Sequence, residues 1–195
     1  RYTSHTDSVT RKDVNAFYAE KTGECIAGTI NKMIDTELSD AYWKNADFKD
    51  VQDELLTIAL AQQKAPVLFS KILTVDECLR NSKPGEPKVE IHHLFPTDFM
   101  DSLQGAQKRT PEQTNIGANK APISASENST IGSNGPSSYV PTLKKSFTNE
   151  EWFKQCRTYA LPDNWEAMCF DDFVAARSKL LPGVIRKSLD ALRTS

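Results

Sequence analysis

The chain has 195 residues, enough for one domain or for two small domains that share a core. Its formal net charge of −2 argues against binding of nucleic acid through overall positive charge. No apolar run approaches the length of a membrane span and no signal peptide is visible, so we expect a soluble cytoplasmic protein without a membrane partner. The first residue is Arg1 rather than Met, and we therefore expect a fragment or a processed product.

The charge is uneven along the chain. Residues 1–60 carry 7 basic and 11 acidic side chains, whereas residues 108–145 carry 5 basic and 2 acidic ones. A local basic region of this kind can hold a phosphate backbone, although uneven surface charge is common. The cysteines have no CxxC spacing, which argues against a structural zinc knuckle and is typical of buried free thiols in a reducing cytoplasm. They are Cys25, Cys78, Cys156 and Cys169.

Both ends of the sequence predict helices. Apolar residues recur at helical spacing over residues 11–36 and 47–63. In the second of these helices the spacing places five residues inward: Phe48, Val51, Leu55, Ile58 and Leu60. Further along, Thr148 and Glu151 form a capping box that starts another helix. Residues 170–192 predict an amphipathic helix, or two helices separated by the proline within that stretch.

The centre of the sequence differs from both ends. Residues 89–145 contain short apolar runs separated by Gly, Pro, Ser, Asn and Thr, a pattern too irregular for long helices. Ser124 and Glu127 form an S-x-x-E signature, which predicts that a helix begins there. We therefore predict the order strand, loop, strand, helix for residues 89–133, with Asn128 in the first turn of the helix.

Two of the chain's three histidines are adjacent, within the apolar stretch VEIHHLFP. A nuclease that uses one metal ion needs a divalent cation to stabilise charge at the scissile phosphate and a base to take a proton from water. Histidine suits the base because its unperturbed pKa lies near neutrality. Since adjacent strand residues point to opposite faces, His92 and His93 can do different work only where the strand twists or ends. Pro96 nearby is compatible with such an end.

His92 and His93, followed by Asn119 and by Asn128 after eight intervening residues, resemble the HNH pattern of ββα-metal (His-Me finger) nucleases. The resemblance implies that His92 and Asn128 bind the metal, that His93 is the general base, and that Asn119 holds the loop by hydrogen bonds. An amide oxygen in place of a second histidine favours a hard ion, Mg²⁺ or Mn²⁺. Some members have a further histidine one helical turn later, where this chain has Gly132, so water or phosphate completes the shell.

A narrower resemblance covers almost the whole chain. The segments IHHLFP, NIGANKAPISASENSTIG and GPSSYV, with the tail LPDNWEAMCFDDFVAARSKLLPGVIRKSL, are similar to the C-terminal HNH domain of GmrSD-type modification-dependent restriction enzymes. The same domain ends the SspE-like effectors of phosphorothioate-based phage defence. In that family a nucleotide-hydrolysing domain precedes this one, but this chain contains neither a DGQQR-like motif nor a P-loop. The resemblance therefore implies a partner, an N-terminal NTPase or sensor domain of the same polypeptide.

Together these features predict an α+β fold, a mainly helical domain with an embedded ββα-metal motif at about residues 89–133. The helical scaffold is expected at residues 1–80 and 147–195, within a single nuclease domain of residues 1–195. The resemblance implies a metal-dependent DNA endonuclease or nickase that acts on foreign double-stranded DNA, such as phage DNA, in a bacterial restriction or defence system. Three lysines are candidate contacts to the DNA backbone: Lys120, Lys144 and Lys145.

Two other functions stay open from the sequence. In one, the domain is a catalytically silent module that binds DNA or regulates a partner; in the other, it is an HNH ribonuclease. Assays of metal-dependent turnover on DNA and on RNA separate these two functions from the DNA endonuclease. Some further polar residues are expected to be structural. Asn115 and Asn134 are expected in turns, and Asp171 and Asp172 at a helix start, which favours acidic side chains. The three tryptophans are expected in the core.

Overall fold

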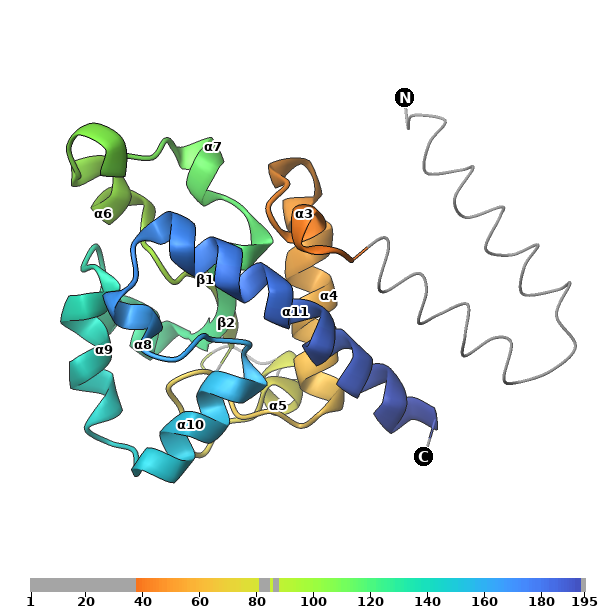
Figure 1. Cartoon of the computed structure of the whole chain (residues 1–195). Coiled ribbons are helices and arrows are strands. Elements are labelled where there is room, and N and C mark those ends of the chain that lie inside the picture. Colours follow the sequence, from red (N-terminus) through yellow and green to blue (C-terminus); the bar gives the residue numbers. More distant parts are fainter. Residues whose placement is uncertain (1–37, 81–84, 86–87, 194–195) are drawn as a thin grey trace, which may run out of the picture. The chain divides into compact units, whose positions relative to one another are not determined.

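The computed structural model describes residues 38–80, 85 and 88–193, so the helix predicted over residues 11–36 and Cys25 lie outside the described residues. The described part is mostly helical and has a two-stranded antiparallel sheet, which agrees with the predicted α+β class (Figure 1). The α-helices are α3 (Asp40–Trp43), α4 (Lys49–Gln62), α5 (Val75–Arg80), α6 (Thr97–Ser102), α7 (Pro111–Thr114), α8 (Ala125–Ile131), α9 (Pro136–Lys144), α10 (Asn149–Thr158) and α11 (Phe170–Arg193). Short 3-10 helices lie between some of them: η1 (Ala46–Phe48), η2 (Gly105–Gln107), η3 (Gly117–Asn119) and η4 (Trp165–Ala167).

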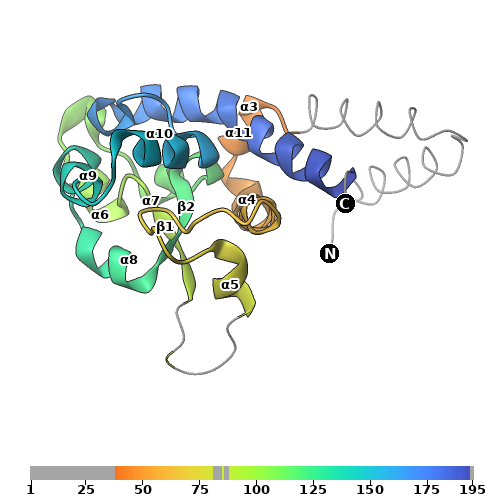
Figure 2. The ribbon, with the colours of Figure 1, turned by 90° about the horizontal axis from the view of Figure 1, so that it is seen from below.

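The sheet consists of β1 (Val89–His93) and β2 (Lys120–Ser124), which pair antiparallel in a register that places His93 opposite Lys120. The connection between the strands is long and contains α6, α7 and two 3-10 helices. The chain before α5 also touches β2, through an isolated parallel bridge. Figure 2 shows α10 and α11 along one side of the strands and α5 and α8 along the other. The sheet therefore has helices on both sides, and part of β1 is open to solvent.

Helix α4 is rotated from the orientation that its apolar spacing predicts, although Leu60 is buried and Leu55 is partly buried against the core, as predicted. Val51 and Ile58 are 56% and 53% exposed, so their predicted inward position is wrong. The buried face contains Gln52, Leu56, Thr57, Ala59 and Leu60. Gln52 explains this rotation, because its fully buried amide donates to two backbone carbonyls before α4 and accepts the Gly117 N–H at 2.7 Å. A buried amide with all its partners sets the face of a helix, and hydrophobic periodicity gives no sign of it.

The two C-terminal helices follow their sequence signals. The predicted capping box starts α10: Thr148 Oγ1 accepts the Glu151 N–H, and the Glu151 carboxylate accepts the Thr148 N–H. α11 is one continuous helix with Pro182 inside it, so the predicted amphipathic region forms one helix rather than two. Asp171 and Asp172 lie in its first turn, where the helix dipole favours carboxylates.

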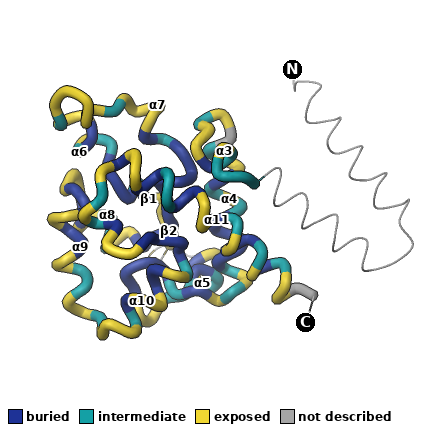
Figure 3. The backbone as a smooth tube through the Cα atoms, viewed as in Figure 1, coloured by how far each residue is buried: buried dark blue, intermediate teal, exposed yellow. Residues whose placement is uncertain are grey.

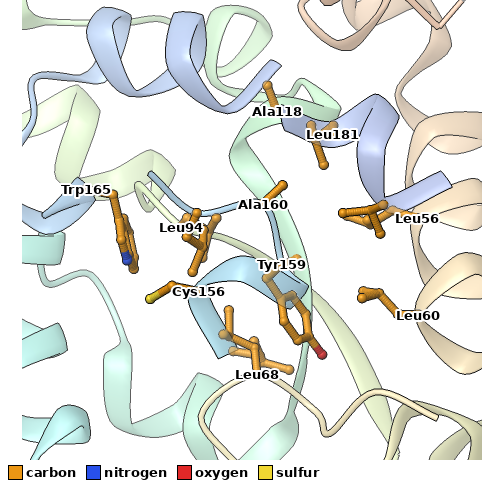
Figure 4. Close-up of a cluster of buried hydrophobic side chains, with 14 of the residues drawn as sticks. Leu56, Leu60, Leu68, Leu94, Ala118, Cys156, Tyr159, Ala160, Trp165 and Leu181 are labelled. Carbon is orange, nitrogen blue, oxygen red and sulfur yellow. The ribbon is translucent and has the colours of Figure 1, made fainter. Parts of the chain in front are cut away.

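Buried side chains from most of the elements form one core. Figure 3 marks the buried positions along the backbone in dark blue. Figure 4 shows part of it, with labelled residues from α4, α10, α11 and the segments next to the strands. All three tryptophans are buried, as predicted: Trp43, Trp152 and Trp165. Cys78 and Cys156 are buried free thiols, also as predicted, whereas Cys169 is exposed. Among the described residues, no helix has the length and apolar character needed to cross a membrane.

Candidate active site

The two predicted strands and the helix after them are present in the predicted order at residues 89–131, but the connection predicted as a loop contains α6 and α7. α8 follows β2 directly, and Ser124 caps it by accepting the Glu127 N–H at 3.4 Å. The second half of the predicted capping box is missing, because the Glu127 carboxylate accepts a hydrogen bond from Ser126 instead. The cap nevertheless begins the helix where the sequence indicates, which places Asn128 in the first turn of α8.

An open pocket of about 240 Å³ lies between the end of β1 and the start of α8. His92, His93 and Asn128 all line it, with Pro96 and with Asp98 in the first turn of α6. Neighbouring strand residues face opposite sides of a regular sheet, but β1 ends at His93. The end of the strand therefore lets two adjacent imidazoles border the same pocket.

His92 is the more buried of the pair, with 6% of its surface exposed. Its Nε2 is buried and has no hydrogen-bond partner among the described residues. Burial lowers the pKa of His92 to about 4, and the nearby side chains of Asn128 and Glu90 offset only part of that effect. At neutral pH His92 is therefore a neutral imidazole with an unused nitrogen, which is the form that binds a metal ion.

His93 is held by a residue that the sequence analysis assigned to a turn. Asn115 lies at the end of α7, and its Oδ1 is 3.3 Å from His93 Nε2. An amide oxygen can only accept, so this contact puts the ring proton on Nε2 and leaves Nδ1 as the basic nitrogen. Burial lowers the pKa of His93, the charge of Lys120 adds to this shift, and Asn115 opposes it. His93 is thus neutral at pH 7 and has one nitrogen available to take a proton.

Asn119 does not border the pocket but holds the backbone beside it. Its side chain is fully buried, where Oδ1 accepts the Phe95 N–H at 2.9 Å. Its Nδ2 donates to the Phe95 carbonyl at 3.1 Å and to the Thr114 carbonyl at 3.0 Å. One amide therefore ties the turn after β1 to the end of α7, the two segments that carry His93 and Asn115. This is the kind of loop-holding contact that the HNH resemblance implies for Asn119.

Glu90 is a site residue that the sequence analysis missed. Its Oε2 accepts a hydrogen bond from Asn128 Nδ2 at 2.7 Å. An ionised carboxylate can only accept, so the contact fixes the amide with its nitrogen toward Glu90 and its oxygen turned away. The strand period gives a signal that could have found this residue, because Glu90 and His92 are two positions apart and share one face of β1.

The three lysines proposed as DNA contacts do not line the pocket. Lys120 is buried and forms an ion pair with Asp53 of α4 at 2.6 Å, so its ammonium is not available to a phosphate. The Lys144 ammonium lies 5.5 Å from the centre of the Trp152 ring. Lys145 is exposed at the end of α9. Of the three, Lys144 and Lys145 are not held in an ion pair among the described residues, and both lie outside the pocket.

Arg177 links α11 to the site and was also missed. Its guanidinium is fully buried and donates to the carbonyls of Ala118 and Lys120, at 2.9 and 2.8 Å, on either side of Asn119. It donates to the Tyr159 carbonyl as well. Arg177 follows Phe173 by four residues on the buried side of α11, and an arginine on that side of an amphipathic helix is the signal that marks it.

A divalent ion bound in this pocket would have few protein ligands. Among the described residues, no group of three or more His, Cys, Asp or Glu side chains is arranged to hold a metal. His92 Nε2 has no partner among the described residues, and the Asn128 amide, which Glu90 orients through its nitrogen, also interacts with His92; these two side chains are the ones that could hold an ion. Two protein ligands leave most positions of a six-coordinate ion to water or phosphate, as is usual for Mg²⁺.

We predict that His92 makes the metal-free protein less stable in acid. Its pKa is about 4 in the folded state against an ordinary 6.5, so the unfolded chain binds more protons between these values. The stability that depends on a neutral His92 is fully present above pH 6.5 and is lost as the pH falls through 4. The free energy of unfolding changes by about 3 kcal/mol over this range. Urea unfolding in EDTA at pH 7 and pH 4 measures it.

Other groups also titrate over this pH range, so the comparison uses His92→Gln, which cannot titrate. The variant should lose about 3 kcal/mol less than the unchanged chain between the two pH values. Equal losses in the two proteins would show that His92 is not buried in its neutral form.

Comparison of the chain with protein-family models, with curated proteins and with solved structures gives no match. Any assignment of function therefore depends on the motif in the sequence and on the geometry of the pocket.

Proposed function

We propose that the chain is a metal-dependent DNA endonuclease of the HNH type, which nicks foreign DNA as part of a bacterial defence system. The observation that carries this proposal is the meeting of His92, His93 and Asn128 at one open pocket. The three residues come from the end of β1 and the start of α8, and Asn119 holds the loop that connects the strands. The HNH resemblance assigns roles to the same four residues.

His92 and Asn128 are the residues that would hold the divalent ion, Mg²⁺ or Mn²⁺. When bound, such an ion stabilises the negative charge that develops on the scissile phosphate and on the departing oxygen. The charges near the pocket support the need for a cation. Asp98 lines the pocket and Glu90 contacts Asn128, so without a cation the site would repel a phosphodiester.

His93 is the base in this proposal. Asn115 orients the ring through Nε2, so that Nδ1 takes the proton from the attacking water. Burial keeps the imidazole neutral at physiological pH, which removes the need to lose a proton first. The pocket is open, as an endonuclease requires, because a continuous strand must pass across it without an end. One such pocket cuts one strand, so a double-strand break needs a second copy, a second nick or a partner.

Relaxation of supercoiled plasmid tests the proposal. The chain is incubated with plasmid in EDTA, in Mg²⁺ and in Mn²⁺, and with a labelled RNA of mixed sequence under the same conditions. Open-circular plasmid should accumulate only with a divalent ion, and DNA should be cut in preference to RNA. Cleavage of RNA alone would favour the ribonuclease function. Metal-independent binding of DNA without cleavage would favour a silent DNA-binding module.

Glu90→Ala is expected to lower the nicking rate by about 10- to 100-fold at a fixed metal concentration, because removal of a partner that orients a metal ligand has effects of this size. The metal concentration that gives half-maximal nicking should rise. Glu90→Gln keeps one oxygen that can accept from Asn128, so its nicking rate should lie between those of Glu90→Ala and the unchanged chain. Both are compared by metal titration of the nicking rate.

Glu54→Ala is the matched control, since Glu54 is an exposed carboxylate on α4 outside the pocket. It should nick as fast as the unchanged chain. If Glu90→Ala has the same metal dependence as this control, Glu90 does not orient the metal ligand.

A further inference from the structure

A second hollow lies between α10, the segment that follows it and α11. It is an open groove of about 860 Å³, and no residue of the candidate active site lines it. Figure 2 shows α10 and α11 on the opposite side of the strands from α8. The groove therefore has a surface of its own, separate from the pocket that holds His92, His93 and Asn128.

Large apolar side chains are exposed in this groove. Phe153 of α10 is 52% exposed and Leu180 of α11 is 47% exposed. Leu161 and Val184 also line the groove and are nearly buried. Single exposed apolar residues are common on protein surfaces, but here two of them border one concave surface with apolar residues between them. That arrangement fits a partner that inserts apolar side chains.

The rim of the groove is basic. Lys154, Arg157 and Lys187 line it and are exposed, and the structure shows no ion pair for any of them within its described residues. Asp163 is the one acidic residue that the described lining contains. The excess of positive charge around an apolar floor calls for a partner that combines apolar and acidic side chains.

Gly183 gives an independent sign of close approach. It lies in the interior of α11, where glycine is among the least favourable residues, and it lines the groove. A Cβ built at this position would meet no described atom within 4 Å, so packing among the described residues does not require glycine here. Absence of a side chain at this point lets another backbone approach α11 closely.

We infer that this groove binds an acidic amphipathic helix of a partner protein. An apolar helix face packs between Phe153 and Leu180 and over Gly183, and flanking carboxylates meet the three basic residues of the rim. Helices laid into grooves of this kind are a common mode of recognition, with apolar anchors three and four residues apart. A DNA backbone would use the cations but would leave both large apolar side chains without a role.

The test uses the whole 195-residue chain and a fluorescent 20-residue helical peptide, with leucine along one face and glutamate on the other. A second peptide has lysine in place of every glutamate. Fluorescence anisotropy should show binding of the acidic peptide, weakened by added salt, and none of the basic one. Phe153→Ser with Leu180→Ser, and separately Lys154→Glu with Arg157→Glu, should each weaken binding by about tenfold or more, which is the range of interface hot spots.

Gly183→Leu is the sharpest variant. Leucine favours the helix and its Cβ would lie in open space among the described residues, so the unfolding midpoint should not fall, whereas peptide affinity should drop by about tenfold. Lys145→Glu, an exposed lysine outside the groove, is the control for charge and should bind the peptide normally. Because the groove residues lie outside the active-site pocket and none of them is a proposed DNA contact, plasmid nicking should be unchanged in the groove variants.

Four results would overturn the inference. The first is no binding of the acidic peptide at 1 mM, a concentration that corresponds to a binding free energy of about −4 kcal/mol. The second is equal binding of the two peptides, and the third is peptide binding that the groove variants leave unchanged. The fourth is loss of DNA binding in the rim variants, which would make the rim a phosphate contact. Self-association of the chain that Phe153→Ser abolishes, seen by sedimentation, would assign the groove to a second copy instead.

Discussion

His93→Ala should slow metal-dependent nicking of supercoiled plasmid by about 10²- to 10⁴-fold, the range that removal of a general base produces. His93 lies at the end of β1, where it borders the pocket with His92 and Asn128 and is oriented by Asn115. Alanine removes the nitrogen that takes the proton but leaves the proposed metal ligands in place. The rate is measured from the loss of supercoiled plasmid in Mg²⁺ and in Mn²⁺.

Two comparisons separate a lost base from a disturbed fold. Asn115→Ala keeps the imidazole but removes its hydrogen bond, and should slow nicking by about tenfold, as loss of an orienting contact does. His93→Gln retains polar bulk without a basic nitrogen and should be as slow as His93→Ala. Nicking by His93→Ala at the rate of the unchanged chain, after repurification that removes contaminating nucleases, would exclude His93 as the base.

The pH dependence of the rate follows from the same residue. The pKa of His93 lies below its usual 6.5 because the ring is buried and Lys120 is near. A lowered pKa keeps the base neutral to more acidic pH, so the rate should stay high at pH 6.5 and fall only as the pH drops below that value. Nicking rates from pH 5 to pH 8 measure this limb. A fall centred at or above pH 6.5 would place His93 in a more solvated setting.

Local sequence signals predict the structure correctly where the contacts that form it join neighbouring residues. Ser124 and Thr148 cap the helices that they indicate, because a cap needs only the next three residues of the chain. The order of the two strands and the helix after them follows from the same kind of signal. The face of α4 does not, because Gln52 bonds to Gly117, which is 65 residues away. A contact of that range leaves no trace in local periodicity.

The candidate site divides in the same way. The HNH pattern indicates His92, His93 and Asn128, and strand alternation is enough to add Glu90. The partner of Lys120 could not be predicted, since Asp53 comes from a helix 67 residues earlier. Without that partner a lysine beside the motif resembles a phosphate contact. With it, Lys120 becomes a buried charge that stabilises the scaffold and lowers the pKa of His93.

Arg177→Leu should lower the free energy of unfolding by about 3 kcal/mol. The guanidinium is fully buried and donates to the carbonyls of Ala118, Lys120 and Tyr159. Leucine leaves these acceptors without partners, and each buried group of this kind costs about 1–3 kcal/mol. Relief of a buried charge offsets part of the loss, since burial lowers the pKa of Arg177 to about 9 and still leaves it charged at pH 7. Urea unfolding at pH 7 measures the difference.

The same variant should impair the site before it unfolds the domain. Two of the Arg177 acceptors flank Asn119, so their release loosens the residue that ties the turn after β1 to the end of α7. The nicking rate of Arg177→Leu at about 20 °C should therefore fall while circular dichroism still shows a folded chain. Arg177→Lys should recover part of the stability but less of the nicking rate, because a lysine ammonium lacks the forked guanidinium that spans both carbonyls. Lys179→Leu, on the same helix and exposed, is the control and should change neither quantity by much. If Arg177→Leu unfolds at the same urea concentration as that control, the bonds to the Asn119 loop do not hold it in place, and α11 is only a cover for the core.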